Sequence, residues 1–330
     1  TSFGGKNGWG SFWVVSMLAS DDAEFNTSNN NTTADAQDVD ALILKANNRF
    51  IFTVYAETYE GINRANIVLE AVENGKNDLT DAEKKAIVAE AKFLRGFFHF
   101  VAAQIWKTAP LVLETAKTLQ QTYKNSVNVW MQKWNEAVVA FEDVEKNGGY
   151  EVLPEYEDVF ASAYENNKES VFEVQFGGPY SDDNSWILDD NGNEDFKSTQ
   201  GTARIWFFNA RINGGGVRWY VPTTKLKALF DEEPGDKRLD AALYYKEGED
   251  FTAYDGGGIT PGVFTTALPP AATSQSPTGL AIKKYMGSKN LDPAYYRNGV
   301  TFNNERFFRY PELLLLHAEA LLNGGTPKGI

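Results

Sequence analysis

RFFRYPELLLLHAEALLN, residues 306–323, is the stretch that decides how this chain folds. Its four consecutive leucines suggest a membrane-spanning helix, but such a helix needs roughly 20 mostly apolar residues. Here His317 and Glu319 follow the leucines almost at once. Asn323 and two glycines then end the helix, because glycine is the usual residue after a helix C-terminus. The stretch therefore predicts a buried helix rather than a membrane span.

The composition is acidic and rich in aromatic residues. The chain has 31 Lys and Arg against 45 Asp and Glu, which gives a net charge of −14. Phosphate binding needs a basic surface, so no nucleic-acid partner is expected. Aromatic residues make up 14% of the chain, which favours a folded domain over a disordered acidic one. Cysteine is absent, which excludes disulfides, thiol catalysis and cysteine-ligated metals.

Helical periodicity dominates the first half of the chain. Apolar residues recur at three- and four-residue spacing over 47–72 and again over 80–106. Thr80 and Glu83 have the spacing of a capping box, which predicts that the second helix begins there. The segment 169–176 alternates apolar and polar residues and predicts a strand. Further helices are predicted over 126–146, after Pro154, over 222–233 and over 310–322.

Motifs of common catalytic and cofactor sites are missing from the sequence. There is no HExxH, GxSxG, GxGxxG or GxxxxGK[ST], so no cofactor or metal is predicted. His99 and His317 each lie in an apolar helical pattern, where a hydrogen-bonded core histidine is the usual role. DDNGNED at 189–195 resembles a calcium loop, but aligning Gly192 with the loop glycine places Ile187 at the first ligand position. A glycosidase carboxylate pair stays open, because sequence does not give the distance between two carboxyls.

Several tryptophans lie in polar, glycine-rich surroundings after Gly177, where the predicted loops are long. Such long loops inside a compact domain are usually functional. Loop tryptophans can pack as a satellite core, or they can expose a flat apolar face. An exposed face suits the C–H side of a sugar ring, while nearby Asp, Asn and Arg bind its hydroxyls. The residues alone therefore indicate an acidic, mostly helical binding protein.

Five stretches carry motifs in a fixed order. They are YEGINRANIVLEAV (59–72), AEAKFLRGFFHFVAAQIW with APLVL (89–113), YEDVFASAYENNKESVFEVQF (156–176), VPTTKLKALFDEEPGDKRLDAAL (221–243) and the opening stretch (306–323). Together they resemble the SusD/RagB family of Bacteroidetes outer-membrane nutrient-binding lipoproteins. The family's leader peptide, lipidated cysteine and last helical segment are not in this chain, which indicates a partial chain.

The resemblance implies a mainly α, SusD-like fold. It consists of tetratricopeptide-like helical hairpins, an irregular loop-rich ligand-binding part and minor β structure. The implied layout of this single 1–330 domain is a hairpin framework over about 47–176 and 306–323, a ligand-binding part over about 177–305, and an N-terminal segment, 1–46, that contributes to the site.

The resemblance also implies the function. Members of the family bind oligosaccharides at the cell surface and pass them, without chemistry, to a SusC-like TonB-dependent transporter. This chain is thus expected to be no enzyme and to need no cofactor. It is expected at the outer membrane as a surface-exposed lipoprotein, held only by a lipid anchor absent from this chain. The alternatives are a RagB-like peptide receptor, a glycoside hydrolase, and a helical-repeat scaffold with buried tryptophans.

Ligand contacts are expected from variable loops rather than from the family motifs. The resemblance also matches the family's early Ser-Asp pair to Ser20-Asp21 and points to the segment that follows. The candidate ligand-binding residues are Trp186, Trp206, Trp219, Arg218, Asp21, Asp22, Phe25 and Asn26.

Overall fold

The computed structural model describes residues 12, 14–25, 34–75, 78–107, 109–115, 127–128, 133–176, 220–248, 250–254, 259–263, 278–284, 296–297, 300–301 and 303–327. The chain forms two compact units. Unit 1 comprises Thr1–Val15 and Leu44–Gln132, and unit 2 comprises Ser16–Ile43 and Lys133–Ile330. The layout as one framework with a loop-rich part over 177–305 stays a prediction.

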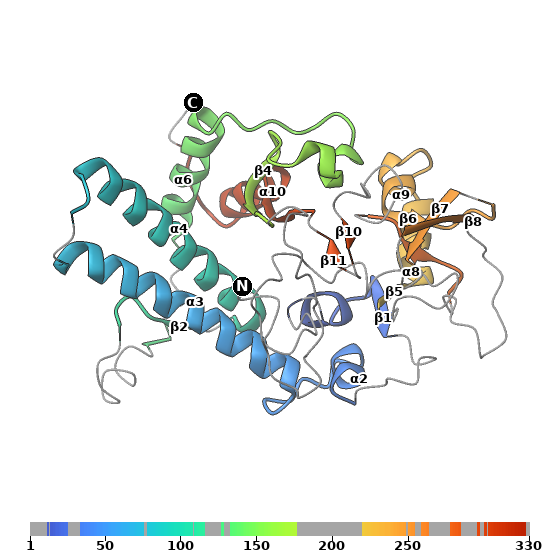
Figure 1. The fold of residues 1–330 in the computed structure, drawn as a ribbon, viewed down its shortest axis with the longest axis horizontal. Coiled ribbons are helices and arrows are strands. Elements are labelled where there is room, and N and C mark those ends of the chain that lie inside the picture. The colour runs from blue at the N-terminus through green and yellow to red at the C-terminus, as the bar shows by residue number, and fades with distance from the viewer. Residues whose placement is uncertain are drawn as a thin grey trace. The chain divides into compact units, whose positions relative to one another are not determined.

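Unit 1 is built on a helical hairpin of α3 (Arg49–Asn74) and α4 (Asp81–Trp106), shown in Figure 1. The Asn48 side chain begins α3 by accepting hydrogen bonds from two backbone N–H groups of the first turn. Thr80 begins α4 with the predicted capping box. The Thr80 hydroxyl accepts from the Glu83 N–H at 3.3 Å, and the Glu83 carboxylate accepts from the Thr80 N–H at 2.7 Å. Both predicted helices are confirmed.

The two helices approach closely where Gly61 of α3 faces Phe98 of α4. A Cβ atom at position 61 would lie 2.5 Å from the Phe98 ring, so only glycine fits there without displacing the ring. Each helix buries one apolar stripe, as its spacing predicts. The buried apolar side chains of the pair are Phe50, Val54, Ile62 and Ala65 on α3, and Ala91, Phe97, Val101 and Ala102 on α4.

Polar side chains of this hairpin hold the segment 109–115. Asn66 Nδ2 donates to the Val112 carbonyl at 3.3 Å, and Arg95 donates to Asn66 Oδ1 at 2.9 Å. His99 Nε2 lies 3.1 Å from the same Val112 carbonyl, and burial lowers the pKa of this histidine. His99 is thus a hydrogen-bonded histidine of the framework, as predicted.

Unit 2 contains the other described α-helices. They are α2 (Ala34–Asp40), α6 (Trp134–Asn147), α8 (Thr224–Asp231), α9 (Lys237–Ala242) and α10 (Tyr310–Leu322). Shorter helical turns are the π-helical Val14–Leu18, which crosses the boundary of the two units, and the 3₁₀ turns Asp158–Phe160 and Ser162–Tyr164. Helices α6 and α10 pack against each other.

Helix α10 confirms the helix predicted over 310–322, but it is only partly buried. Leu313 is 3% exposed, whereas Leu315 is 72% and Leu322 88% exposed, so the predicted buried helix is buried on one side and exposed on the other. His317 Nδ1 lies 2.5 Å from Glu145 Oε1 of α6 and ties the two helices together. Among the helices that the structure describes, none is long and apolar enough to span a membrane.

The described strands are short and form six antiparallel two-stranded ribbons (Figure 1). The pairs are β1 (Ala23–Phe25) with β5 (Tyr220–Pro222), β2 (Pro110–Leu111) with β3 (Val127–Asn128), β4 (Ser170–Val174) with β12 (Glu305–Arg309), β6 (Leu243–Tyr244) with β9 (Ala281–Ile282), β7 (Asp250–Tyr254) with β8 (Ile259–Val263), and β10 (Tyr296–Arg297) with β11 (Val300–Thr301). The strand predicted over 169–176 is confirmed as β4. Minor β structure thus accompanies a mainly helical framework, as predicted.

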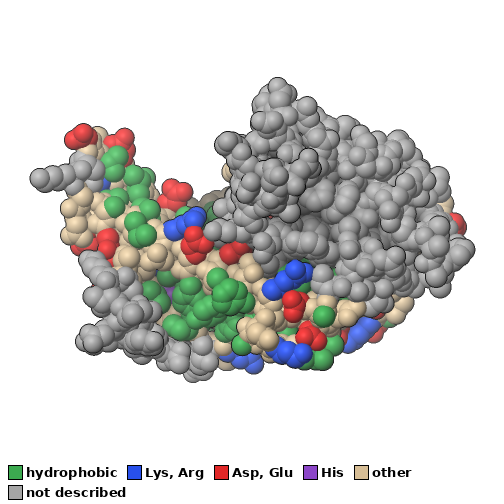
Figure 2. All heavy atoms as spheres, turned by 60° about the horizontal axis from the view of Figure 1, so that its bottom comes forward, with side chains coloured by type: hydrophobic (Ala, Val, Ile, Leu, Met, Phe, Trp, Pro, Cys, Tyr) green, Lys and Arg blue, Asp and Glu red, His purple; other side chains and the backbone are tan. Residues whose placement is uncertain are grey.

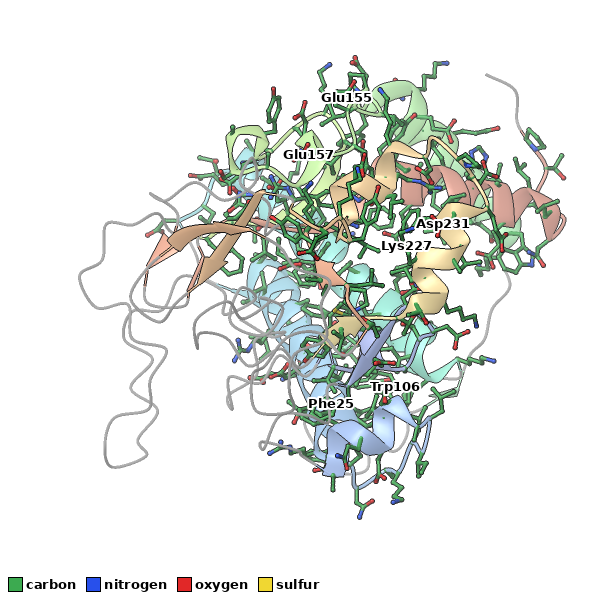
Figure 3. All side chains as sticks on the ribbon, turned by 90° about the vertical axis from the view of Figure 1, so that its right-hand side faces the viewer. Phe25, Trp106, Glu155, Glu157, Lys227 and Asp231 are labelled. Carbon is green, nitrogen blue, oxygen red and sulfur yellow. The ribbon has the colours of Figure 1, made fainter. Side chains whose placement is uncertain are left out.

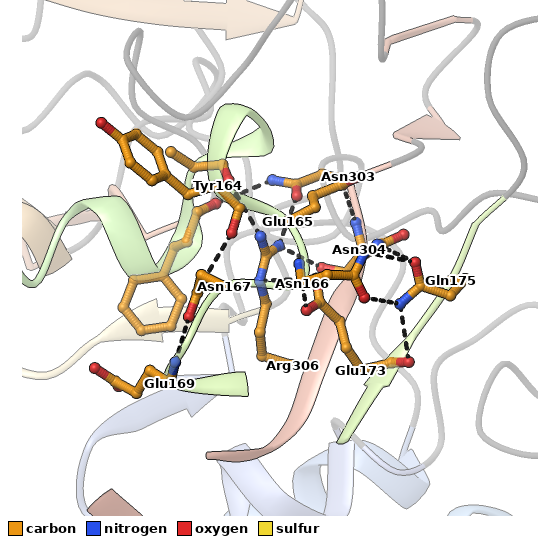
Figure 4. A network of polar contacts seen from close by, with 12 residues as sticks. Tyr164, Glu165, Asn166, Asn167, Glu169, Glu173, Gln175, Asn303, Asn304 and Arg306 are labelled. Carbon is orange, nitrogen blue, oxygen red and sulfur yellow. Dashed lines mark hydrogen bonds and ion pairs between the residues drawn. The ribbon is translucent and has the colours of Figure 1, made fainter. Parts of the chain in front are cut away.

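One buried and one partly exposed ion pair join the strands of the β4–β12 ribbon. Arg306 Nε lies 3.2 Å from Glu173 Oε1, with side chains 0% and 3% exposed, and Arg309 lies 2.6 Å from Glu169. Figure 4 shows how the Arg306 guanidinium also donates to Asn303 Oδ1, at 2.7 Å. The four residues of these ion pairs come from two of the motif stretches, and here they join the strands to each other.

Two expected helices differ from the structure. The helix expected over 126–146 begins only at Trp134, because Val127–Asn128 forms strand β3 instead. No α-helix follows Pro154; the chain turns and enters the 3₁₀ turn Asp158–Phe160. There the Phe160 ring is buried and packs edge-on against the Tyr156 ring, 5.1 Å away. Side-chain burial has overridden the local helical preference.

Candidate ligand-binding site

The structure describes some of the candidate residues predicted from the sequence but not others. Asp21, Asp22 and Phe25 are described and belong to unit 2. The other candidates lie outside the described residues: Asn26, Trp186, Trp206, Arg218 and Trp219. The site can therefore be built from the segment 20–25 and from what it contacts.

The segment 20–25 leads into the β1–β5 ribbon. In its register Phe25 pairs with Tyr220, and Ala23 pairs with Pro222. Antiparallel strands place the end of one strand beside the start of the other. Phe25 is the last described residue before Asn26, and Tyr220 is the first after Trp219. The ribbon thus pairs the residue that precedes Asn26 with the residue that follows Trp219, although the two are far apart in sequence.

A polar turn at Ser20–Asp22 precedes β1. The Ser20 hydroxyl donates to the Met17 carbonyl at 2.6 Å and accepts from the Asp22 N–H at 3.3 Å. The side chain of Asp21 is 75% exposed and forms an ion pair with Lys225. Such an exposed pair contributes little to stability. The turn therefore presents carboxylates to solvent from a backbone that is itself hydrogen-bonded.

The same turn is attached to the first residues after β5. Thr223 N–H donates to the Asp22 carbonyl at 3.0 Å, and the Thr223 hydroxyl donates to the Asp21 carbonyl at 2.6 Å. Thr223 is also the N-cap of α8, on whose surface Lys227 pairs with Asp231 at 2.5 Å (Figure 3). The sequence predicts a helix over 222–233 but does not indicate that its start contacts the N-terminal candidates.

Phe25 is buried beneath this region rather than exposed on its surface. Phe25 is 4% exposed, and its N–H donates to Asp40 Oδ1 of α2 at 3.2 Å (Figure 3). Burial raises the pKa of the Asp40 carboxyl. Burial, and then the charge of Asp40, raise the pKa of Glu24. A direct ligand contact of Phe25 stays a prediction.

A third stretch reaches the same ribbon. The Thr278 hydroxyl donates to the Pro222 carbonyl of β5 at 2.7 Å. Thr278 is the first described residue after 264–277, just as Tyr220 is the first after 177–219. Described residues next to three undescribed stretches, 26–33, 177–219 and 264–277, thus contact one another at β1–β5.

A separate group of aromatic side chains lies in unit 1. The Tyr55 ring packs 4.7 Å from the Tyr59 ring and 5.1 Å, edge-on, from the Trp106 ring. Trp106 is half-buried, in agreement with the packing role expected of a helical tryptophan. Phe52, 63% exposed, adds to the apolar surface, and Figure 2 shows hydrophobic side chains gathered on this unit.

Within the described part of the chain, no group of three or more His, Asp and Glu side chains could hold a metal ion. This describes those residues alone. The exposed carboxylates of the Ser20–Asp22 turn and the hydroxyls around them are hydrogen-bonding groups, and they suit a polar, uncharged ligand rich in hydroxyls.

Comparisons with known proteins define the class to which this architecture belongs. A family model described as "Starch-binding associating with outer membrane" matches residues 8–147, and one described as "SusD family" matches residues 168–330. Solved structures of the SusD superfamily share the fold. The chain therefore belongs to the SusD/RagB family, as its motifs indicated.

Three of the similar solved structures illustrate the fold. A SusD superfamily protein from Bacteroides vulgatus is 19% identical, with a TM-score of 0.63, over 96% of this chain and 70% of its own. Surface glycan-binding protein A from Bacteroides thetaiotaomicron, solved in complex with laminarihexaose, is 18% identical, with a TM-score of 0.65, over 94% and 73%. Surface glycan-binding protein A from Bacteroides fluxus is 18% identical, with a TM-score of 0.64, over 98% and 73%. Among curated proteins, none matches this chain significantly.

Proposed function

We propose that the protein binds oligosaccharides at the cell surface and does not change them chemically. Its family and the oligosaccharide bound by one structural relative support this proposal. The observation in this chain that carries it is the β1–β5 ribbon. There the polar turn Ser20–Asp22 is bonded to the segment that directly follows Trp219.

The proposed site combines apolar faces with hydrogen-bonding groups. Trp186, Trp206 and Trp219 would supply flat faces for the C–H side of sugar rings. The carboxylates of Asp21 and Asp22 would accept hydrogen bonds from sugar hydroxyls. Binding of this kind needs no cofactor and no nucleophile.

The cellular role follows from the family. We propose that the protein acts at the outer membrane as a lipid-anchored surface protein and delivers its ligand to a SusC-like TonB-dependent transporter. Protease treatment of intact Bacteroidetes cells that express the full gene should remove the protein, and detergent extracts should retain the transporter with it. Protection from the protease would contradict the surface location.

The decisive test of ligand class is a glycan array probed with the purified chain, with a peptide panel beside it. Binding to one class of neutral glycan, weakened in Asp21→Ala/Asp22→Ala, is the expected result. Binding to peptides alone would show that the ligand is a peptide rather than a glycan. Release of cleaved sugar, abolished by replacing one carboxylate, would identify a glycoside hydrolase. Binding to neither would favour a scaffold.

A further inference from the structure

The Thr223 hydroxyl serves two parts of the fold at once. As N-cap of α8 its oxygen accepts from the Leu226 N–H at 3.1 Å. A hydroxyl also has one hydrogen to donate, and Thr223 donates it to the Asp21 carbonyl at 2.6 Å. The Thr223 N–H meanwhile donates to the Asp22 carbonyl. One residue thus fixes both carbonyls of the candidate turn to the start of a helix.

Thr80 shows what an ordinary cap does in the same chain. Its hydroxyl accepts from the Glu83 N–H at 3.3 Å and lies 2.6 Å from the Glu83 carboxylate. Both partners belong to the helix that Thr80 itself begins. The outward bond of Thr223 to residue 21 is therefore not required by helix capping, since Thr80 caps a longer helix without such a bond.

The other side-chain restraints on the turn are weaker or local. The Asp21–Lys225 ion pair joins side chains that are 75% and 61% exposed, and solvent screening leaves such pairs little strength. The Ser20 bonds act within the turn and do not orient it against β5. Without the Thr223 hydroxyl, the Asp21 carbonyl would lose its bond to the start of α8, while the Thr223 N–H bond to Asp22 and the β1–β5 pairing that begins at Ala23 would remain.

We propose that Thr223 is a positioning residue for the ligand site. It holds the backbone that carries the Asp21 and Asp22 carboxylates at a fixed place relative to β5. This role rests on the proposed glycan-binding function. Thr223 itself touches no ligand in this scheme and acts through the turn.

The test compares Thr223→Val, which removes the hydroxyl but keeps the shape, with Thr80→Val as the matched control. The probe is the glycan that wild-type protein binds most tightly on an array that includes laminarihexaose. Both variants lose a cap bond, so both should lose thermal stability. Only Thr223→Val should bind the glycan more weakly, about three- to tenfold, as expected for one lost hydrogen bond. Thr223→Ser should restore the affinity.

A double-mutant comparison separates positioning from a general loss of structure. In the Asp21→Ala/Asp22→Ala background, Thr223→Val should cause no further loss of affinity, because the groups that it positions are gone. If Thr223→Val does not fold, Thr223→Gly serves instead, since glycine at an N-cap costs only a few tenths of a kcal/mol.

Each outcome is decisive. Equal glycan affinity of the wild type, Thr223→Val and Thr80→Val would overturn the positioning role and leave the proposed function standing. An additive loss in the Asp21→Ala/Asp22→Ala background would also overturn it, because Thr223 would then act elsewhere. A wild-type protein that binds no glycan would overturn the proposed function and, with it, this role.

Discussion

Leu42 adopts a backbone conformation that leucine disfavours. Its φ is 56°, and its N–H donates to the Val39 carbonyl while the Ile43 N–H donates to the Asp38 carbonyl. This is the Schellman arrangement, here ending α2, and it usually has glycine at the position of Leu42. The Leu42 side chain is 64% exposed, so its burial contributes little to offset the strain.

We therefore expect Leu42→Gly to raise the free energy of unfolding by about 0.5–1 kcal/mol, since relief of the left-handed strain exceeds the entropy that glycine adds to the unfolded chain. Urea denaturation measures the difference. The control is Ala41→Gly. Among the described non-glycine residues, only Leu42, Lys107 and Asn166 have a positive φ, so Ala41 has no such strain to relieve. Glycine at position 41 should therefore be destabilising. A loss of stability in Leu42→Gly would show that the leucine side chain makes a stabilising contact.

Glu57 is a carboxyl group that the fold makes harder to ionise. Burial, chiefly, raises its pKa to about 7, with Glu60 adding to the effect, and its Oε2 has no hydrogen-bond partner. A raised pKa of an acid means that the unfolded state loses its proton first as the pH rises. Stability should therefore fall between about pH 4.5 and 7 and stay lower above that range.

Glu57→Gln should accordingly raise the melting temperature at pH 8 and leave it nearly unchanged at pH 4. Calorimetry at both pH values gives the comparison. Glu73→Gln is the control, because Glu73 lies on the same helix α3 and is exposed. A gain for Glu57→Gln of equal size at pH 4 would contradict the ionisation argument.

At the scale of elements, the Arg306–Glu173 pair is the feature with the largest expected energetic effect. Arg306→Ala would leave the buried Glu173 carboxylate without its cation, which should cost about 3–5 kcal/mol of unfolding free energy. The double variant Arg306→Ala/Glu173→Gln should recover part of that loss, because the uncompensated charge is removed. Chemical denaturation of the three proteins gives the values.

The matched control is the surface pair of Lys237 and Glu155, whose side chains are 75% and 56% exposed. Lys237→Ala should change the unfolding free energy by less than about 1 kcal/mol. If Arg306→Ala were as mild as Lys237→Ala, the buried pair would not be what holds the β4–β12 ribbon.

The sequence predicted those elements whose signals are local. The capping box at Thr80, the apolar spacing that follows it, and the alternation that becomes β4 all depend on neighbouring residues, and all are confirmed. The β1–β5 ribbon was not predicted, because its strands are three residues each and pair across the chain. A pairing between strands that are far apart in sequence leaves no periodic pattern of apolar residues from which it could be predicted. The position of Thr223 beside Asp21 was missed for the same reason.

At the scale of the whole molecule, the tryptophans that the sequence predicts to lie in loops carry the main prediction about binding. Trp206→Ala and Trp219→Ala should each weaken glycan binding by about 1–3 kcal/mol, in line with stacking of flat rings on aromatic side chains. Isothermal titration calorimetry measures the change. Trp106→Phe is the control, because Trp106 packs within the aromatic group of unit 1 and should not affect affinity. Unchanged affinity in both loop variants, with the fold intact, would exclude them from the site.

The β1–β5 pairing also has a consequence for how the protein matures. Residues 23–25 meet residues 220–222, and closing so long a loop is slow and entropically costly compared with forming the α3–α4 hairpin. During synthesis the first partner must wait for the second to leave the ribosome. In refolding experiments, helical circular dichroism should therefore return before the capacity to bind ligand. The proposed ligand-binding surface would then be the last part of the molecule to form.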